Sequence, residues 1–353
     1  MKIAFSMARM RGGGAERVVS ELVNFFAKEG HDVSIMLAKQ AGCVYELEQN
    51  VKLIDLSDND KGFVSRVKAI RKCIKDSNFD IVISFLTNTN IETIIAAMGI
   101  KAPVIISERN NPYVDPNERI YRVLRKLTYC FADGYVFQTP DARDFFSRRI
   151  KKKSTVIMNP INPHLPERHE GEREKRIVNV GRLVKQKNQK LFIDAFYEFY
   201  LTHPEYTAQI YGDGPLEKEL KEYISEKNMD NSIKLCGFSK TILSDIQKAA
   251  MFVMTSDYEG MSNALIEAVG MGVPSISTDH PIGGARMTIN DGENGFLVPV
   301  GDARSITEKM SVIADNQAFA EQISENGVKL REKLSVDEIA TQWLNYISIV
   351  KKS

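Results

Sequence analysis

The sequence predicts an α/β protein made of two Rossmann-like, doubly wound domains. Short apolar strands alternate with amphipathic helices over residues 2–158, which is typical of a parallel sheet covered by helices. The same alternation begins again at Ile177, after a proline-rich, charged segment without an apolar period, Asn159–Arg176. A chain of 353 residues is too long for one ordinary core and suits two domains.

The first domain is expected to span residues 1–165. Its first strand, Lys2–Met7, leads through a glycine loop, Gly12–Gly14, into a helix with apolar residues at helical spacing. The later strands of this half are short apolar runs at Asp32–Leu37, Val51–Leu56, Ile81–Phe85, Val104–Ser107, Gly134–Gln138 and Ser154–Met158. Its helices are expected at Ala15–Glu29, Phe63–Ser77, Thr89–Gly99, Pro116–Phe131 and Thr139–Ile150.

The second domain is expected to span residues 173–335. Its strands are predicted at Ile177–Val180, Thr207–Tyr211, Ile233–Cys236, Met251–Thr255, Ser275–Ser277 and Phe296–Val298. Its helices are predicted at Asn188–Leu201, Leu216–Lys227, Lys240–Ala249, from Asn263 onward, Ala303–Ala314 and Asn316–Leu334. A last helix within residues 336–353 is expected to pack back on the first domain.

The composition is that of a soluble globular protein, with 43% hydrophobic and 26% charged residues. No apolar run is long enough to cross a bilayer, and the N-terminus has no signal-peptide core. The four cysteines show neither metal-ligand spacing nor pairing, which suits a reducing compartment. These features predict a cytoplasmic protein.

Charge is unevenly distributed along the chain. Residues 1–165 hold 25 Lys and Arg against 18 Asp and Glu, a net +7, whereas the remainder holds 22 against 28, a net −6. A basic half indicates an anionic partner, and because no nucleic-acid-binding motif is present, nucleic acid is not expected. An anionic membrane surface fits better. Helix Phe63–Ser77 and the segment Arg143–Lys153 mix cations with apolar residues, although those apolar residues could equally pack against the sheet.

The stretch Met251–Gly272 carries the clearest candidate site. A strand, a polar elbow over 256–262 and a helix follow one another, and the free N–H groups at the helix start form an anion site. Glu259 and Glu267 bracket the helix start in the spacing E-x7-E, too far apart to share one proton or one metal. They are suited to grip two hydroxyl-bearing parts of a long ligand such as a nucleotide-sugar. The alternative is a surface helix with two solvated glutamates.

Two cations follow the first strand of the second domain. Arg182 and Lys187 lie in the turn before a helix, and a guanidinium with an ammonium can hold a diphosphate without a metal. Solvated loop cations are the alternative. The turns at Gly214 and Phe238 can place groups against a flat base, and both are also compatible with ordinary turn chemistry.

No metal or other cofactor is expected. Asp58 and Asp60 form an Asp-x-Asp pattern, but turn formation and helix capping explain that polar loop. No two histidines stand at ligand spacing. The glycine triplet also lacks the G-x-G-x-x-G spacing of a dinucleotide site.

As a set, these motifs resemble the family-four retaining glycosyltransferases of the GT-B fold, in which two domains face across a cleft. The resemblance covers nearly the whole chain. It rests on GGGAERV at 12–18, VGRLVKQKN at 180–188, GDGPL at 212–216, E-x7-E at 259–267 and P-x-G-G at 281–284. VISFLTNTN at 82–90 and IISERNN at 105–111 look most like the subgroup that extends lipid-linked oligosaccharides, including bacterial N-acetylgalactosamine transferases.

The resemblance implies a role for each matching residue. Glu267 should hold the ribose hydroxyls, Glu259 the transferred sugar, and Arg182 and Lys187 the diphosphate. Backbone N–H groups should assist at the positions Gly13, Gly14, Gly260, Met261, Ser262 and Asn263. The implied reaction is metal-independent, retaining transfer of a hexose or N-acetylhexosamine from a UDP-sugar. The implied acceptor is a lipid-linked bacterial surface glycan, such as a capsule or exopolysaccharide precursor, at the inner face of the plasma membrane.

One position departs from the family pattern. Many members carry a histidine after the strand that ends here at Ser107, whereas this chain has Arg109. Because an arginine is not a general base near neutral pH, we expect Arg109 to bind a phosphate or sugar oxygen on the acceptor side.

Two other functions remain open from the sequence. One is a non-catalytic sugar-nucleotide-binding partner of another transferase, against which the intact Arg182, Lys187, Glu259 and Glu267 argue. The other is a nicotinamide-dependent oxidoreductase, against which the missing dinucleotide fingerprint argues.

Overall fold

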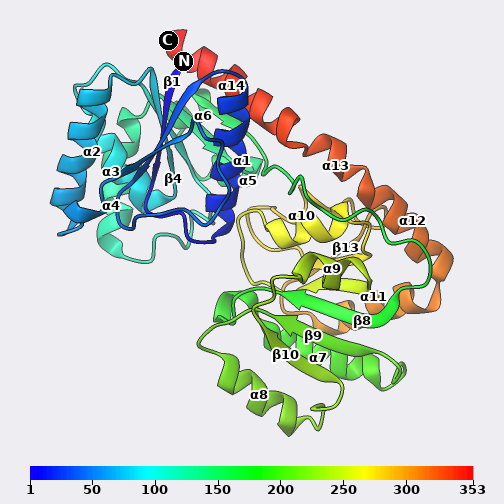
Figure 1. Cartoon of the computed structure of the whole chain (residues 1–353). Helices are drawn as coiled ribbons and strands as arrows, with labels where there is room; N and C mark the ends of the chain where they lie inside the picture. Colours follow the sequence, from blue (N-terminus) through cyan, green and yellow to red (C-terminus); the bar gives the residue numbers. More distant parts are fainter. Residues whose placement is uncertain (353) are drawn as a thin grey trace. The chain divides into compact units, whose positions relative to one another are not determined.

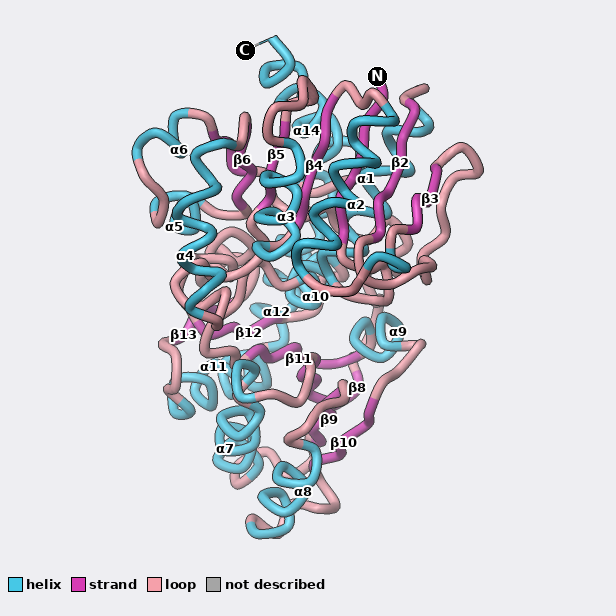
Figure 2. Tube along the Cα trace, turned by 90° about the vertical axis from the view of Figure 1, so that its left-hand side faces the viewer, coloured by secondary structure: helices cyan, strands magenta, loops and turns pink. Residues whose placement is uncertain are grey.

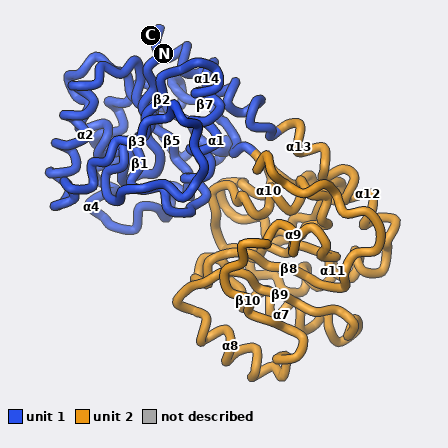
Figure 3. Tube along the Cα trace, in the orientation of Figure 1, with its two compact units in different colours: residues 1–160, 334–353 blue, residues 161–333 orange. Residues whose placement is uncertain are grey.

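The computed structural model describes residues 1–352 and divides the chain into two compact units, shown in Figure 3. Unit 1 comprises residues 1–160 and the C-terminal stretch from Leu334, and unit 2 comprises Ile161–Lys333. The first boundary lies at Pro160 rather than the expected residue 165, because Ile161 and Leu165 pack against Gly270 of unit 2.

Unit 1 contains a seven-stranded parallel sheet in the order β3-β2-β1-β4-β5-β6-β7 (Figure 2). Its strands are β1 Lys2–Met7, β2 Asp32–Leu37, β3 Lys52–Asp55, β4 Ile81–Phe85, β5 Val104–Ser107, β6 Gly134–Phe137 and β7 Ser154–Val156. Strands β1, β2 and β4 are almost wholly buried, as expected where helices cover both faces of a parallel sheet. The strand order confirms the doubly wound topology.

Helices α1 and α14 lie against each other on one side of this sheet, and α2, α3 and α4 lie on the other (Figure 1). The helices of unit 1 are α1 Gly14–Lys28, α2 Phe63–Ser77, α3 Thr87–Ala97, α4 Arg119–Thr128, α5 Pro140–Asp144, α6 Arg148–Lys152 and α14 Val336–Lys352. Short 3-10 turns occupy Ser57–Asn59 and Tyr129–Phe131.

The helix expected at Thr139–Ile150 is wrong as a single element. It is interrupted between α5 and α6, where two consecutive rings pack on different partners: Phe145 against Tyr113 at 4.7 Å and Phe146 against Phe137 at 4.9 Å between centroids. The chain is not helical between Asp144 and Arg148, and both rings pack within unit 1 there.

A chain of aromatic rings ties α14 to the core of unit 1. Phe26 of α1, Phe5 of β1, Phe85 of β4 and Trp343 of α14 follow one another with centroid separations of 6.0, 6.1 and 5.6 Å. Trp343 is fully buried. Burying such an indole contributes about 1.5–3 kcal/mol or more, so this contact anchors the C-terminal helix on the first unit.

Unit 2 contains a six-stranded parallel sheet in the order β10-β9-β8-β11-β12-β13. Its strands are β8 Glu174–Val180, β9 Thr207–Tyr211, β10 Ile233–Gly237, β11 Ala249–Met254, β12 Ser275–Thr278 and β13 Phe296–Val298. Its helices are α7 Gln189–Tyr200, α8 Glu217–Glu226, α9 Ile242–Gln247, α10 Asn263–Gly270, α11 Ala303–Asp315, α12 Gln317–Val328 and α13 Leu330–Lys333, with a 3-10 turn at Lys185–Lys187. The fold of both sheets is as the sequence predicts.

No helix within residues 1–352 has the length and apolar character needed to span a bilayer.

Candidate active site

The candidate site lies where neighbouring strands of unit 2 end. Strands β8 and β11 are adjacent in the sheet, and the chain leaves β8 toward β9 on one side and β11 toward β12 on the other. Such a point of reversal is where parallel α/β sheets bind ligands, because the loops diverge and expose helix N-termini. The turn after β8 and the elbow after β11 therefore meet at this edge.

Hydrogen bonds join the turn to the elbow. The Thr255 hydroxyl lies 3.1 Å from the carbonyl oxygen of Lys187 and 3.0 Å from that of Asn188. The Asn188 side-chain amide donates to the Asp257 carboxylate at 2.8 Å. Asn188 has a φ of 46°, in the left-handed region that asparagine tolerates better than most residues. These bonds fix the register of the two loops.

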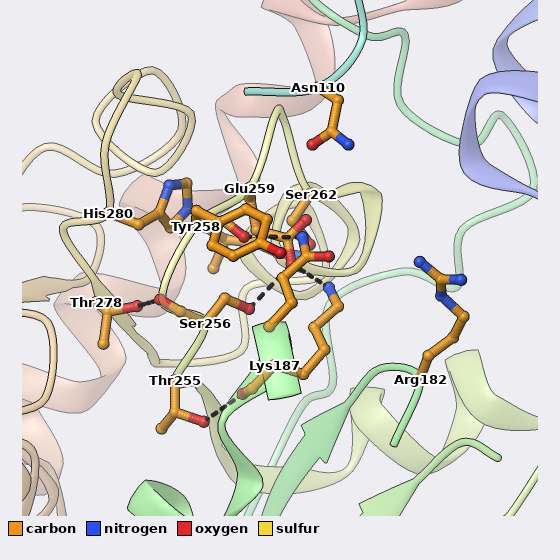
Figure 4. A network of polar contacts seen from close by, with 12 residues as sticks. Asn110, Arg182, Lys187, Thr255, Ser256, Tyr258, Glu259, Ser262, Thr278 and His280 are labelled. Carbon is orange, nitrogen blue, oxygen red and sulfur yellow. Dashed lines mark hydrogen bonds and ion pairs between the residues drawn. The ribbon is translucent and has the colours of Figure 1, made fainter. Parts of the chain in front are cut away.

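An ion pair between Lys187 and Glu259 lies at the centre of this arrangement, as Figure 4 shows. The Lys187 ammonium donates to Glu259 Oε1, which also accepts from the Ser256 hydroxyl at 3.0 Å. The Ser256 carbonyl in turn accepts from the Thr278 hydroxyl at 2.7 Å. Both charged side chains are largely buried, so separating the two charges would be costly.

Glycines give the loops room to approach. A Cβ on Gly181 would lie 3.0–3.2 Å from the aliphatic carbons of Lys187, so this glycine lets the lysine chain lie flat along the strand end. A Cβ on Gly214 would lie 2.4 Å from the carbonyl oxygen of Leu183. Gly214 therefore has a packing reason to be glycine, and its donor-binding role stays a prediction.

A second close approach fixes the elbow itself. A Cβ on Gly284 would lie 1.8 Å from the carbonyl oxygen of Gly260. The P-x-G-G motif thus supports the backbone next to Glu259. His280, which precedes this motif, is fully buried, and burial lowers the pKa of its imidazole.

Replacing Gly284 by alanine is expected to displace the elbow and lower the free energy of unfolding by about 2–4 kcal/mol, because a backbone oxygen cannot yield. Thermal or denaturant unfolding measures this change. Alanine at Gly301 is the control: no heavy atom lies within 4 Å of its Cβ, so only the left-handed backbone costs about 1 kcal/mol. Equal destabilisation of the two variants would contradict this account of Gly284.

The start of α10 carries the remaining elbow residues. Ser262 caps the helix by accepting from the backbone N–H of Leu265. Met261 and Ser262 are buried, and Asn263 begins the helix. Glu267 lies one turn further along α10 and is half-buried. Glu259 precedes the helix, so the two glutamates do not share one helical face.

Arg182 and Phe238 are open to solvent. Figure 4 shows the Arg182 guanidinium apart from the Lys187–Glu259 network. Phe238 follows β10 and is 74% exposed. An exposed ring of this kind is available to stack on a flat base, which is the role predicted for it.

In unit 1 the glycine loop is bound by the chain itself. The Glu16 carboxylate accepts from the backbone N–H groups of Gly12 at 2.7 Å and of Gly13 at 3.0 Å. It occupies the N-terminus of α1, where an anion is favoured by the helix dipole. A phosphate bound by the N–H of Gly13 would have to displace Glu16, so the donor-binding role of Gly13 and Gly14 stays a prediction.

Arg109 is buried within unit 1 rather than exposed at its surface. Its guanidinium stacks 4.4 Å from the centroid of Phe85 and donates to Asn159 at 2.8 Å. Its Nε and Nη2 atoms have no hydrogen-bond partner among residues 1–352. Burial lowers the pKa of Arg109 to about 9, so it stays charged near neutral pH. The acceptor-side role stays a prediction.

Sequence reasoning missed a buried carboxyl cluster beside Arg109. The Thr87 hydroxyl lies 2.9 Å from Glu108 and 3.0 Å from Asp115, and Tyr129 donates to Glu108. Burial raises the pKa of both carboxyl groups. A hydroxyl has one proton, so both Thr87 contacts form together only when one carboxyl group is protonated. The IISERNN motif contains Glu108 but does not indicate that Thr87 and Tyr129 are its hydrogen-bond partners, because both lie on other elements.

The Asp-x-Asp loop forms an ion pair within unit 1. The Asp60 carboxylate accepts from Arg66 at 2.6 Å, and Arg66 also pairs with the buried Glu92. In the part of the chain that the structure describes, no three His, Cys, Asp or Glu side chains cluster as metal ligands would.

Both halves of the chain match known family models. Residues 12–165 match the model "Glycosyltransferase Family 4", and residues 163–330 match "Glycosyl transferases group 1". The two matches together span residues 12–330.

Curated relatives match over the full length. One is an α-1,4-N-acetyl-D-galactosaminyltransferase of Campylobacter jejuni, named for a GalNAc-GalNAc-diNAcBac-diphospho-undecaprenol acceptor; it is 30% identical, with 100% of each chain covered. Another, from the same organism, is named a diphospho-undecaprenol 4-α-N-acetylgalactosaminyltransferase and is 26% identical, covering 98% of this chain and 99% of the relative.

Solved structures share the fold. HepE of Anabaena, crystallised with UDP and glucose, superimposes with a TM-score of 0.84 at 19% identity over 99% of both chains. TarM of Staphylococcus aureus superimposes with a TM-score of 0.78 at 14% identity, over 98% of this chain and 100% of TarM. These neighbours confirm the expected GT-B fold class.

Proposed function

This chain belongs to the family-four glycosyltransferases, and from that premise we propose that it transfers a hexose or N-acetylhexosamine from a UDP-sugar to a lipid-linked glycan. We further propose that the transfer retains the configuration of the anomeric carbon and needs no metal. A bacterial surface polysaccharide precursor is the acceptor class that this proposal names.

The observation that carries the proposal is the Lys187–Glu259 pair at the start of α10. A lysine ammonium has three N–H donors, and Glu259 accepts one of them. The other two are suited to the oxygens of a diphosphate, while the second oxygen of Glu259 is suited to a sugar hydroxyl. One ion pair would thus hold the two parts of the donor between which the bond breaks.

In the proposed chemical step, positive charge at the site assists departure of the phosphate. The bond between the anomeric carbon and the phosphate oxygen breaks, and the acceptor oxygen forms the new bond on the same face of the sugar. The acceptor proton passes to the leaving phosphate, which departs as UDP. Lys187, Arg182 and the N-terminus of α10 would stabilise the negative charge that develops on the phosphate, a contribution of several kcal/mol.

The relatives support the choice of donor and acceptor. Both Campylobacter jejuni enzymes are named for undecaprenyl-diphosphate-linked acceptors, and HepE was crystallised with UDP and glucose. Both family models describe glycosyltransferases, which favours this class over a nicotinamide-dependent oxidoreductase.

A screen of UDP-sugars for protection against thermal unfolding tests the donor. A ligand at about 100 times its dissociation constant adds roughly 2.7 kcal/mol to the free energy of unfolding. We expect UDP and one or a few UDP-sugars to raise the melting temperature, and ADP-sugars and nicotinamide dinucleotides to leave it unchanged. Stabilisation by nicotinamide dinucleotides alone would contradict the proposal.

Sugar transfer is expected to continue in excess chelator. The reason is that the diphosphate charge falls on Lys187 and Arg182, which need no metal to hold it. Initial rates with and without chelator measure this. Complete loss of activity that manganese or magnesium restores would overturn metal independence and direct attention back to Asp58 and Asp60.

The alternative of a non-catalytic partner subunit makes the opposite prediction about activity. Such a subunit would bind UDP-sugars in the thermal screen and yet transfer nothing when purified alone.

A further inference from the structure

The structure changes which surface of unit 1 is suited to meet a membrane. The sequence points to the apolar side of α2 and to the segment Arg143–Lys153. However, Ile70 and Ile74 of α2 are at most 1% exposed, and Phe146 and Ile150 are buried as well. These four side chains pack inside unit 1 and are not available to lipid, which leaves Val64, at 63% exposure, as the one exposed large apolar residue of α2.

Helix α4, in contrast, exposes large apolar residues to solvent. Three large apolar residues on it face solvent: Ile120, Val123 and Leu127 are 61%, 51% and 62% exposed. At 100° per residue they lie within about 60° of one another on the helix surface. Phe131, in the turn that follows the helix, extends the row and is 61% exposed. We call these four residues the α4 stripe.

Cations flank the α4 stripe. Arg119, Arg122 and Lys126 are exposed on the same helix, and α4 contains no Asp or Glu. Helix α6 contacts the Tyr129–Phe131 turn and brings further exposed cations to that end, namely Arg148, Arg149 and Lys152. An apolar row with cations beside it is the pattern of a helix that lies in the interface of an anionic bilayer.

The core of unit 1 holds α4 in this orientation. Arg125, on the inner side of the helix, donates to the carbonyl oxygens of Asp115 at 2.7 Å and Pro112 at 2.8 Å, and its guanidinium lies 4.9 Å from the Phe145 centroid. The helix is therefore fixed with its apolar row outward, and no rotation that hides the row keeps these bonds.

We propose that the α4 stripe and its flanking cations form a docking surface for an anionic lipid bilayer. The choice of a lipid surface rests on the proposed function, because a lipid-linked acceptor is reached at a membrane. A second copy of this chain is disfavoured as the occupant, since two such surfaces would bring Arg119 and Lys126 against their own counterparts. Each lysine or arginine near an anionic surface adds attraction that salt screens.

The test is co-sedimentation of the full chain with vesicles of phosphatidylcholine alone or with phosphatidylglycerol, at low and high salt. We expect binding to the anionic vesicles at low salt and weaker binding at high salt. Leu127→Asp should weaken it roughly tenfold or more, because a leucine side chain leaves the lipid and a carboxylate replaces it. Arg119→Glu combined with Lys126→Glu should weaken it at least as much.

Leu201→Asp is the matched control. Leu201 is also a leucine at 62% exposure, but it lies at the end of α7 in unit 2. This variant should bind vesicles as the parent does. The vesicles contain neither nucleotide-sugar nor glycan, so the docking result does not depend on whether the chain transfers sugar.

Several results would overturn the proposal. The first is that the parent does not bind anionic vesicles at low salt. The second is that the Leu127 and Leu201 variants lose vesicle binding equally, and the third is that the Leu127 variant binds as the parent does. Self-association of the parent that Leu127→Asp abolishes would instead assign the stripe to a second copy. Capture of an acidic protein that competes with the vesicles would assign it to a protein partner.

Discussion

Replacing Lys187 by alanine is expected to lower the rate of sugar transfer by about 10²–10³-fold, the usual effect of removing one group that stabilises transition-state charge. Lys187 is the cation that the structure places against Glu259, beside the N-terminus of α10. Its removal takes positive charge from the leaving phosphate and leaves Glu259 without its ion-pair partner. Initial rates at saturating donor and acceptor measure the effect.

Lys185→Ala is the matched control for this variant. Lys185 lies in the same 3-10 turn and is exposed. It should retain activity within a few-fold, which separates the chemical role of Lys187 from any general effect on the turn. Melting temperatures of both variants check that unit 2 stays folded. Similar rates for the two variants would show that Lys187 does not assist the leaving group.

Glu267→Ala is expected to weaken UDP binding roughly tenfold to a hundredfold, since hydrogen bonds to a charged group contribute about 1.5–3 kcal/mol. The proposed partner of Glu267 is the ribose, which is present in both the donor and the released UDP. Glu259→Ala is expected instead to lower turnover while UDP affinity stays within a few-fold, because Glu259 should contact the sugar that is transferred.

The Lys187–Glu259 ion pair allows a more specific prediction for UDP binding by Glu259→Ala. Removing the Glu259 carboxylate releases the Lys187 ammonium from its ion pair, and the freed ammonium can then bind phosphate more fully. UDP affinity of Glu259→Ala should therefore equal or exceed that of the parent. Calorimetric titration of UDP into each variant distinguishes the two roles. An equal loss of UDP affinity in both would contradict the assignment.

The fold could be predicted from sequence because the patterns that indicate strands, helices and turns each lie within a short segment of the chain. Strand β4 and helix α2 have the bounds that the apolar pattern gives, and the glycine turns mark where strands end. The interruption at Phe145 and Phe146 could not be predicted, since it depends on ring partners such as Tyr113, more than thirty residues away.

Part of the site could be predicted for the same reason. The elbow and the helix that carries Glu267 follow from a short sequence pattern. The ion pair of Lys187 with Glu259 joins residues on two neighbouring loops, and the close contact of Gly284 with Gly260 joins two others. Neither sequence spacing nor residue type indicates which loops meet, because strand order decides it.

The α4 stripe shows a third limit. Helices α2 and α4 are both amphipathic and cationic in sequence, so periodicity alone cannot say whether an apolar side faces the core or the solvent. Arg125 turns inward on α4 while Val123 and Leu127 face outward. On α2, by contrast, Ile70 and Ile74 are buried.

The most direct test of the central claim is transfer by the purified chain itself. The chain is incubated with the UDP-sugar chosen by the thermal screen and a polyprenyl-diphosphate-linked saccharide, and the products are followed by mass spectrometry and by NMR of the new anomeric proton. We predict an acceptor heavier by one sugar, an equal amount of released UDP and the anomeric configuration of the donor. UDP-sugar binding without any transfer would contradict the account and leave a nucleotide-sugar-binding subunit in its place.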